Sequence, residues 1–284
     1  MSSTSPTNTV YAITGANRGL GLGLVKTYLS RPHTTVIGIV RNSAGARMLR
    51  DATRPNTAGA VWGENSSLHT VEADFSDPTI ADAPEIIRER VLSCTDSIDA
   101  TGNSPAKKIT HINALIVSAG TKPTAGPSLS INAADLRSSF EVNTIAPLMT
   151  FQALWPLLQA SQGTKKFILL SSTLGSIGQM EPLFPGGAYG PSKAAANWVV
   201  KSLHQQISED LASVSVSPGW VRTDMGEAFA ADLGADIREM EKAGFMIGLD
   251  EAIEGLVEVV DKATREGMGG KFVTGIKGGF ELSW

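Results

Sequence analysis

The feature that most constrains the fold of this chain is an alternation of short apolar segments with longer stretches that suit helices. Each short segment is nearly continuous in apolar character, as expected when both faces of a parallel sheet are covered. The segments span residues 10–14, 35–40, 68–73, 112–118, 166–171, 213–217 and 270–274. The clearest helical stretches span residues 20–30, 133–160, 188–211 and 250–264. This rhythm predicts a doubly wound α/β fold with a mainly parallel, seven-stranded sheet and helices on both faces.

The length of 284 residues suits one large α/β domain with a sizeable core. Residues 1–8 are polar and lack an apolar core, so we expect a flexible tail before a single domain at 9–284. Two stretches rich in Pro, Gly, Asn, Ser and Thr, 44–67 and 93–108, are expected to be surface insertions. The stretch 226–248 carries several Met and Phe residues, which suit either an apolar substrate flap or an ordinary amphipathic helix.

Charge and composition exclude several classes of function. The chain has 24 basic and 28 acidic residues, a net charge of −4, which argues against binding to nucleic acid or to an anionic membrane surface. Its single cysteine, Cys94, rules out an internal disulfide framework, and the four histidines show no metal-ligand spacing, so we expect no metal site. No apolar run is long enough to cross a bilayer, and no export signal is visible, so a cytoplasmic location is expected.

A glycine-rich turn follows the first apolar segment and opens the first helix. Residues 14–21 read Thr-Gly-Ala-Asn-Arg-Gly-Leu-Gly, with the spacing G-x-x-x-G-x-G. Glycines at such a turn permit tight backbone geometry and a close approach of backbone N–H groups to a pyrophosphate at the helix N-terminus. A tight turn with no ligand is the alternative. The candidate cofactor-contacting residues here are Gly15, Asn17, Arg18, Gly19, Leu20 and Gly21.

The end of the second apolar segment bears on the choice between NAD and NADP. An acidic residue there would bond the ribose hydroxyls of NAD, but this chain has Arg41. A guanidinium can pair with a 2′-phosphate, and Arg18 could supply a second cation, so the pattern favours NADP(H). Two exposed arginines on loops are the alternative. Asp74, after the third segment, suits either an adenine contact or a turn ahead of Ser76.

A tyrosine and a lysine lie one helical turn apart at the start of a long helical stretch. The i,i+4 spacing of Tyr189 and Lys193 places the phenol and the ammonium on one helix face. An ammonium beside a phenol is expected to lower the pKa of the phenol toward the working range of an acid–base catalyst. Ser172 ends the fifth apolar segment, and its hydroxyl could hold a carbonyl oxygen beside the phenol. Ser176 is the rival for this role.

Together these motifs resemble the short-chain dehydrogenase/reductase family, over nearly the whole chain from Thr9 to Trp284. The resemblance rests on the glycine turn, Asn143, Ser172, Tyr189-x-x-x-Lys193 and the segment Pro-Gly-x-Val-x-Thr at 218–223. Within the family, the chain is most similar to norsolorinic acid ketoreductases of fungi and to sniffer-type carbonyl reductases. The resemblance implies a Rossmann-type fold, a proton-donating Tyr189, a pKa-lowering Lys193, a substrate-orienting Ser172 and an Asn143 that holds a relay water. It implies further cofactor contacts from Ala119, Gly120, Asn143, Tyr189, Lys193, Pro218, Gly219, Val221 and Thr223.

The resemblance therefore implies an NADPH-dependent reductase of a small-molecule ketone or aldehyde, with an aromatic polyketide or other secondary-metabolite carbonyl as the expected substrate. Alcohol oxidation by the same residues and a non-catalytic dinucleotide-binding scaffold are the alternatives. The family also implies a homodimer or homotetramer through the helices at 133–160 and 188–211. This chain departs from the family where Asn-Asn-Ala-Gly is replaced by residues 117–120, Val-Ser-Ala-Gly. It also separates Ser172 from Tyr189 by 17 positions, about four more than is usual in the family.

Overall fold

A computed structural model of the chain describes residues 8–55, 60–77, 79–80, 83–103, 108–180 and 185–284. Its main sheet has the strand order β10-β7-β6-β5-β1-β2-β3-β4, and a second sheet pairs β8 with β9. The pairs β1–β2, β1–β5, β2–β3 and β7–β10 are parallel, which confirms the predicted doubly wound, mainly parallel fold. The predicted count of seven strands is wrong, because the main sheet has eight.

The strand that the sequence did not indicate is β4 (Ser97–Asp99), which lies antiparallel to β3 (Ser67–Glu72). It falls within 93–108, the second stretch predicted to be an insertion, of which 104–107 lie outside the described residues. Three residues with Ile98 as their only large apolar member carry too little hydrophobic pattern to be recognised as a strand.

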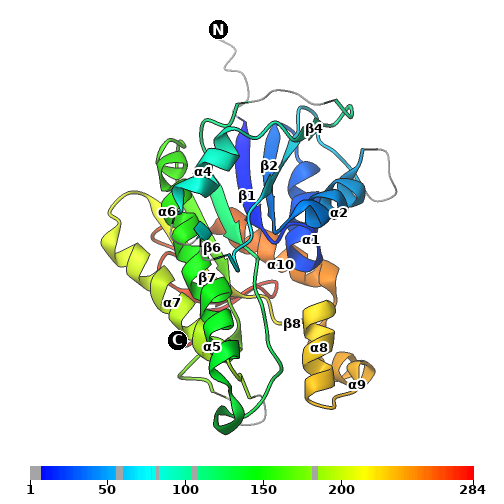
Figure 1. Cartoon of the computed structure of the whole chain (residues 1–284), viewed down its shortest axis with the longest axis vertical. Helices are drawn as coiled ribbons and strands as arrows, with labels where there is room; N and C mark the ends of the chain where they lie inside the picture. The colour runs from blue at the N-terminus through cyan, green and yellow to red at the C-terminus, as the bar shows by residue number, and fades with distance from the viewer. Residues whose placement is uncertain (1–7, 56–59, 78, 81–82, 104–107, 181–184) are drawn as a thin grey trace. The chain divides into compact units, whose positions relative to one another are not determined.

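Contacts divide the chain into two compact units, and unit 1 comprises residues 1–118 and 150–165. Its strands are β1 (Thr9–Thr14), β2 (Thr34–Val40), β3, β4 and β5 (Ala114–Val117). Its helices are α1 (Gly19–Leu29), α2 (Ser43–Thr53), α4 (Glu85–Leu92) and the later part of α6 (Ala146–Gln159). Strands β1 and β2 are buried almost throughout, and α1 and α2 lie beside them (Figure 1). Their apolar residues form the core of this unit.

Helix α2 corrects the expectation that 44–67 is a surface insertion. Asn42 caps the helix by accepting a hydrogen bond from the backbone N of Gly45 at 3.1 Å. Ala46 and Leu49 are buried, and the side chain of Leu49 fills the space above Gly38 of β2. The sequence did not predict this helix, because few of its residues are large and apolar and its buried face is therefore narrow. Residues 56–59 lie outside the described part.

The end of the expected flexible tail is also corrected. Residues 1–7 lie outside the described residues, but Asn8 is held in place. Its side chain donates to Thr35 Oγ1 at 3.1 Å, and its carbonyl oxygen lies 3.1 Å from His111 Nε2. The contacts of Asn8 thus place it with the domain and not with the expected tail.

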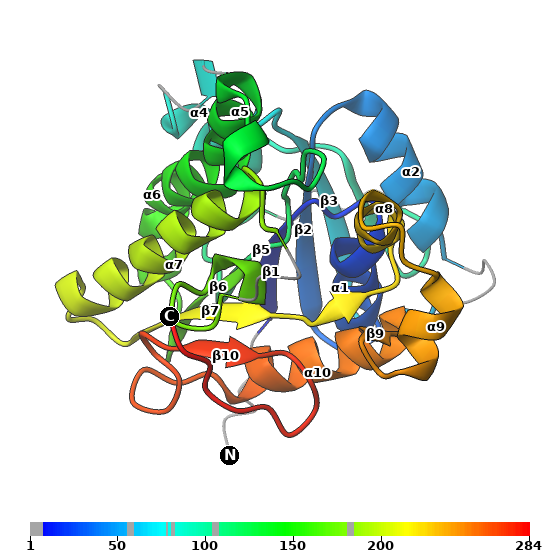
Figure 2. The same ribbon diagram turned by 90° about the horizontal axis from the view of Figure 1, so that it is seen from below.

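Unit 2 comprises residues 119–149 and 166–284. In chain order its elements are η1 (Ser128–Ser130), α5 (Ala133–Phe140), η2 (Glu141–Ile145), the start of α6, β6 (Lys165–Leu170), η3 (Thr173–Gly175), α7 (Tyr189–Gln206), β7 (Leu211–Ser217), β8 (Trp220–Val221), α8 (Asp224–Asp232), α9 (Ile237–Lys242), β9 (Met246–Ile247), α10 (Leu249–Lys262) and β10 (Phe272–Thr274). Figure 2 shows α7 alongside β6 and β7, and α10 alongside β10.

The predicted helix at 133–160 is divided. Between α5 and α6 the backbone takes the wider π-helical form over Glu141–Ile145, and this segment contains Asn143. Such π-helical turns are rare and occur frequently at functional sites. The π-helical turn therefore supports Asn143 as a candidate site residue.

The stretch 226–248 is built from α8, α9 and β9, and not from one helix. Near its end, β9 pairs in parallel with β8, which precedes the stretch, so that Trp220 lies opposite Met246 and Val221 opposite Ile247. Of its apolar residues, Phe229 and Met246 are buried, whereas Phe245 is 57 % exposed. Packing accounts for the first two, and Phe245 is the apolar side chain of this stretch that faces solvent most openly.

Candidate active site

In unit 1 the glycine turn has the backbone that a phosphate-binding turn requires. Gly15 and Gly19 have φ of 66° and 51°, a region that favours glycine. A Cβ on Gly21 would lie 2.2 Å from the carbonyl oxygen of Gly15, so only glycine lets α1 begin this close to the turn. Within the described residues no side chain caps the N-terminus of α1, and its first turn has no acidic residue. This terminus therefore suits an anion.

The other unit 1 candidates lie near strand ends. Arg18, in the turn, and Arg41, directly after β2, are both exposed. Asp74 follows β3, and its Oδ1 accepts hydrogen bonds from the backbone N of Ser76 at 3.0 Å and from Ser76 Oγ at 2.6 Å. The turn that was the alternative for Asp74 is thus present. An adenine contact would have to use its other oxygen.

In unit 2 the structure brings Ser172 and Tyr189 together. Ser172 follows β6 and caps η3, accepting a hydrogen bond from the backbone N of Leu174 at 3.2 Å. Tyr189 is the first residue of α7, and its hydroxyl is hydrogen-bonded to Ser172. A strand end and a helix start therefore place two hydroxyls side by side, as the sequence predicted.

The pKa of Tyr189 differs from the value that the Tyr189–Lys193 spacing predicted. Burial raises the pKa of Tyr189 to about 12, and the hydrogen bond with Ser172 acts in the opposite direction. The phenol group lies among protein atoms, although the side chain as a whole keeps some exposed surface. The expected lowering of the Tyr189 pKa is wrong for this arrangement. The Lys193 Nζ lies 5.6 Å from the centre of the Tyr189 ring, and burial lowers the pKa of Lys193 itself to about 8.

Lys193 is a buried cation with a defined position. Only 4 % of the residue is exposed, and its Nζ donates to the carbonyl oxygen of Leu170, in β6, at 2.7 Å. A Cβ on Gly120 would lie 3.7 Å from the same Nζ, so the backbone of Gly120 passes close to the ammonium. The lysine is thus held between β6 and the segment that follows β5.

Asn143 is fully buried and binds that same segment. Its Oδ1 accepts from the backbone N of Thr121 at 2.9 Å, and its Nδ2 donates to the Thr121 carbonyl at 2.8 Å and to Ser192 Oγ at 3.0 Å. The Ser192 hydroxyl in turn donates to the carbonyl oxygen of Tyr189 at 2.6 Å. The π-helical turn therefore aims Asn143 at α7 and at the Gly120–Thr121 backbone.

Ser176, the rival of Ser172, has other partners. Its hydroxyl donates to the carbonyl oxygen of Ser283 at 2.8 Å and accepts from the backbone N of Gln179 at 3.0 Å, and the residue is 1 % exposed. The backbone N of Gly178 also donates to the Trp284 carbonyl at 2.8 Å. Ser176 therefore joins its loop to the last residues of the sequence. Part of the neighbouring loop, 181–184, lies outside the described residues.

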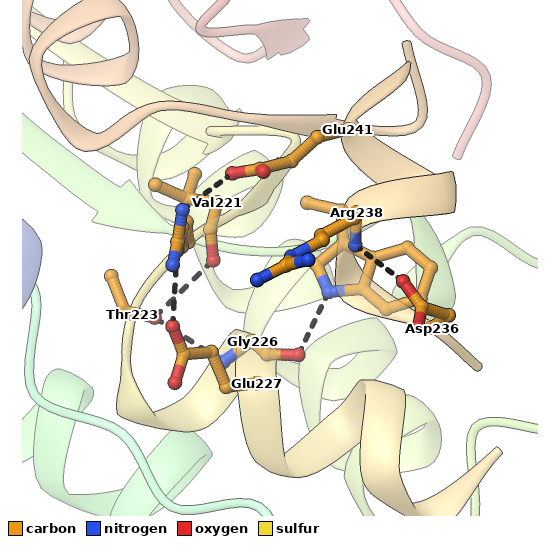
Figure 3. A network of polar contacts seen from close by, with 9 residues as sticks. Val221, Thr223, Gly226, Glu227, Asp236, Arg238 and Glu241 are labelled. Carbon is orange, nitrogen blue, oxygen red and sulfur yellow. Dashed lines mark hydrogen bonds and ion pairs between the residues drawn. The ribbon is translucent and has the colours of Figure 1, made fainter. Parts of the chain in front are cut away.

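Of the expected nicotinamide-side residues, Val221 and Thr223 lie directly before α8 (Figure 3). Pro218 and Gly219 follow β7, and Gly219 has φ of 86°. Thr223 caps α8 by accepting from the backbone N of Gly226 at 3.2 Å, and Val221 lies in β8. A Cβ on Gly226 would lie 2.0 Å from the Val221 carbonyl oxygen. The Thr223 hydroxyl thus has a capping role that the sequence did not indicate.

Three residues that the sequence reasoning did not select also belong to this neighbourhood. Ser192 and Thr121 are the partners of Asn143, and Lys122 follows directly with an ion pair to Asp232 at 2.6 Å. Ser192 could have been found from its place beside Lys193. The pair Lys122–Asp232 joins positions 110 apart, and no local pattern marks it.

In the described part of the chain, no group of three or more His, Cys, Asp or Glu side chains could hold a metal ion. Among the helices that the structure describes, none is long and apolar enough to cross a membrane.

Comparison with known proteins gives concordant results. Residues 87–234 match the family model described as short chain dehydrogenase. The chain is 32 % identical to the norsolorinic acid ketoreductase of Dothistroma septosporum over 97 % of this chain and 92 % of that protein. Among solved structures it resembles the carbonyl reductase Sniffer of D. melanogaster, with a TM-score of 0.72 and 27 % identity over 98 % of this chain and 100 % of that one. It also resembles the NADPH-bound carbonyl reductase from chicken fatty liver, with a TM-score of 0.74 and 25 % identity over the same shares of the two chains.

Proposed function

Since this chain belongs to the short chain dehydrogenase family, we propose that it is an NADPH-dependent reductase of a ketone or aldehyde. The observation that carries the proposal is the Tyr189 phenol, hydrogen-bonded to Ser172 and one helical turn from Lys193. A secondary-metabolite carbonyl, such as that of an aromatic polyketide, is the substrate class. The similarity to a norsolorinic acid ketoreductase supports that class.

The Tyr189 phenol is the proton donor. Because burial raises its pKa to about 12, it is protonated at neutral pH and can give its proton to a carbonyl oxygen that accepts a hydride. The Ser172 hydroxyl, beside the phenol, holds that oxygen in place. A bound nicotinamide would supply the hydride. The phenol does not need a lowered pKa for this step, because the alkoxide that hydride transfer creates on the substrate is a stronger base than a phenolate.

Lys193 and Asn143 support this transfer. The ammonium of Lys193, one helical turn from the phenol, binds the ribose of the cofactor, and its Nζ, 5.6 Å from the centre of the Tyr189 ring, does not lower the pKa of the phenol in this arrangement. Asn143 fixes the Gly120–Thr121 backbone beside that ammonium and, through Ser192, the start of α7. A relay water between Asn143 and Lys193 is part of the proposal.

The cofactor-binding residues are assigned in each unit by itself. In unit 1 the N-terminus of α1 would hold the phosphates, and Arg18 and Arg41 would bind the 2′-phosphate of NADP(H). In unit 2 Lys193 and the backbone around Val221 would hold the nicotinamide and its ribose. The NADPH-bound carbonyl reductase among the similar structures supports NADP(H).

The protonation state of Tyr189 bears on the direction of the reaction. Oxidation of an alcohol needs the phenolate as a base, and burial disfavours the charged form of the phenol. Reduction needs the neutral phenol that burial favours. The neutral phenol is thus the form of Tyr189 that the proposed reduction uses.

We also propose that the protein acts in the cytoplasm as a homodimer or homotetramer. The exposed side chains of Trp198 on α7 and Ile145 in η2, 69 % and 39 % accessible, suit an apolar contact between copies. Sedimentation of the purified chain tests this assembly, and a monomer at micromolar concentration would contradict it.

The first test is turnover of Tyr189→Phe. Purified wild type is expected to oxidise NADPH in the presence of 2-acetylnaphthalene, and the variant to lose this activity by about a hundredfold or more, because the proton donor is gone. NADPH should still raise the melting temperature of the variant. Tyr11→Phe, a change of the same kind in β1, is the control and should keep its turnover.

Two outcomes would refute parts of the proposal. Turnover that survives in Tyr189→Phe would remove the phenol as proton donor. A wild type that is stabilised by NADPH but reduces no carbonyl would instead favour the non-catalytic scaffold.

A further inference from the structure

An ion pair outside the catalytic set connects α8 to the segment that Asn143 holds. Lys122 lies directly after Thr121, whose backbone N and carbonyl oxygen are both bound by the Asn143 side chain. The Lys122 Nζ donates to Asp232 Oδ2 at 2.6 Å, and Asp232 is the last residue of α8. Asn143 is therefore linked to α8 through its hydrogen bonds with Thr121 and through the one from Lys122 to Asp232.

The contact is built from more than one interaction. The same Asp232 oxygen also accepts from the backbone N of Ala125 at 2.9 Å, so one carboxylate oxygen binds two points of the 121–127 segment. The Lys122 Nζ also donates to the Pro123 carbonyl at 3.0 Å and lies 5.2 Å from the centre of the Phe229 ring. Phe229 belongs to α8 and is buried. Lys122 therefore contacts Phe229 and Asp232 of α8, and Asp232 contacts Lys122 and Ala125 of the 121–127 segment.

The Lys122 side chain is better shielded from water than the lysines of ordinary surface ion pairs, whereas Asp232, taken as a whole residue, is exposed. The side chains of Lys122 and Asp232 are 7 % and 20 % exposed, whereas those of Lys262 and Glu258, on the surface of α10, are 65 % and 30 % exposed at the same distance of 2.6 Å. Exposed pairs on their own contribute little to stability. This pair differs in the shielding of Lys122 and in the second hydrogen bond that Asp232 accepts, from the backbone N of Ala125. The bond to Lys122 is also the main reason that the pKa of Asp232 is lowered.

The start of α8 and helix α9 have ion pairs of their own. Arg222, beside β8, pairs with Glu227 of α8 at 3.2 Å and with Glu241 of α9 at 3.1 Å. Figure 3 shows Glu227 and Glu241 with the Thr223–Gly226 cap at the start of α8. These contacts hold the first turn of α8. In the last turn, the Phe229 ring lies 5.2 Å from the Trp220 ring between centroids, and Asp232 is bound by Lys122 and by the backbone N of Ala125.

We propose that Lys122 and Asp232 are positioning residues that fix the end of α8 to the Asn143-bound segment and so shape the substrate side of the site. This inference rests on the proposed reductase function. Tyr189 and Lys193 belong to α7, Ser172 follows β6, and Lys193 Nζ is bound by the Leu170 carbonyl of β6. Breaking the ion pair should therefore weaken substrate binding and leave the proton transfer nearly intact.

Hydrogen exchange tests the structural part without any activity. In Asp232→Asn and in Lys122→Met, the amides of residues 224–232 should exchange at least about tenfold faster than in wild type, with the amides of α7 unchanged. Lys122→Arg, which keeps the charge, should retain slow exchange. Glu258→Gln, which breaks the exposed ion pair on α10, is the matched control. Unchanged exchange at 224–232 in both Asp232→Asn and Lys122→Met would overturn the proposal.

Kinetics test the consequence for substrate. With 2-acetylnaphthalene the KM of Asp232→Asn should rise about fivefold while kcat stays within about twofold of wild type, and acetophenone should show a smaller rise. The double variant Lys122→Met, Asp232→Asn should be no worse than the single variants. A fall in kcat with unchanged KM would overturn the positioning role. If wild type reduces no carbonyl, the proposed function fails, and hydrogen exchange alone decides whether the ion pair holds α8.

Discussion

At the residue scale, the two serines after β6 show how position decides the use of the same hydroxyl. Ser172 ends the strand and shares a hydrogen bond with the Tyr189 phenol. Ser176, one short helical turn later, is buried and bonded to Ser283 and Gln179. The first hydroxyl is placed for chemistry and the second for holding a loop.

Alanine substitution should separate the two roles. Ser172→Ala is expected to lower kcat by about a hundredfold, since the substrate oxygen loses its second hydrogen-bond partner, while the melting temperature changes little. Ser176→Ala should lower the free energy of unfolding by about 1–2 kcal/mol, because the Gln179 amide and the Ser283 carbonyl lose their partner. Turnover and thermal unfolding measured on both variants check this. The reverse assignment would follow from a catalytic loss in Ser176→Ala that exceeds the loss in Ser172→Ala.

The sequence predicted the identity of the site residues better than their electrostatics. Spacing alone places Tyr189 and Lys193 on one helix face, and the strand end places Ser172 nearby. The pKa of Tyr189 depends on how deeply the phenol is buried and on where the ammonium points. Both follow from the packing of β6 against α7, which no local pattern contains.

At the scale of elements, the prediction that the cofactor is NADP(H) depends on residues at the ends of strands. Arg41 directly follows β2 and is exposed, so its guanidinium is available to a 2′-phosphate. Arg41→Ala should weaken NADPH binding by about tenfold and leave NADH binding within about twofold. Titrations of both nucleotides followed by thermal unfolding measure this difference. Arg238→Ala, a change of an exposed arginine on α9, is the control. Equal losses for the two nucleotides would remove Arg41 from the 2′-phosphate site.

Elements with strong apolar patterns were predicted from the sequence, and weakly patterned ones were missed. The predicted helix at 250–264 corresponds to α10, whose face includes Ile253, Leu256 and Val260. Helix α2 and strand β4 were missed because α2 buries mostly small residues and β4 has three residues in all. The π-helical turn at Asn143 changes the backbone hydrogen bonding of the helix without changing the apolar pattern. Periodicity therefore does not reveal it.

At the scale of the whole molecule, function and stability conflict at Lys193. The unfolded chain holds a lysine of pKa 10.5, and burial lowers the pKa in the folded chain to about 8. Between these values the unfolded state binds more protons, so stability rises with pH across this window. Below about pH 8 the folded protein bears the full cost of the buried cation, of the order of 3 kcal/mol. The residue that serves the proposed catalysis is thus one that destabilises the fold.

Lys193→Met should expose this conflict. Methionine has a similar volume and no charge, so the cost of the buried cation disappears, while the Leu170 carbonyl is left without its donor at a cost of about 1–2 kcal/mol. The variant is therefore expected to lose turnover and to be more stable than wild type by about 1–2 kcal/mol near pH 7. Near pH 10 the wild-type amine is neutral, so the advantage should vanish or change sign. Thermal unfolding of both proteins at the two pH values measures this change, and a stability difference that is the same at both would show that the buried charge of Lys193 does not limit the stability of the molecule.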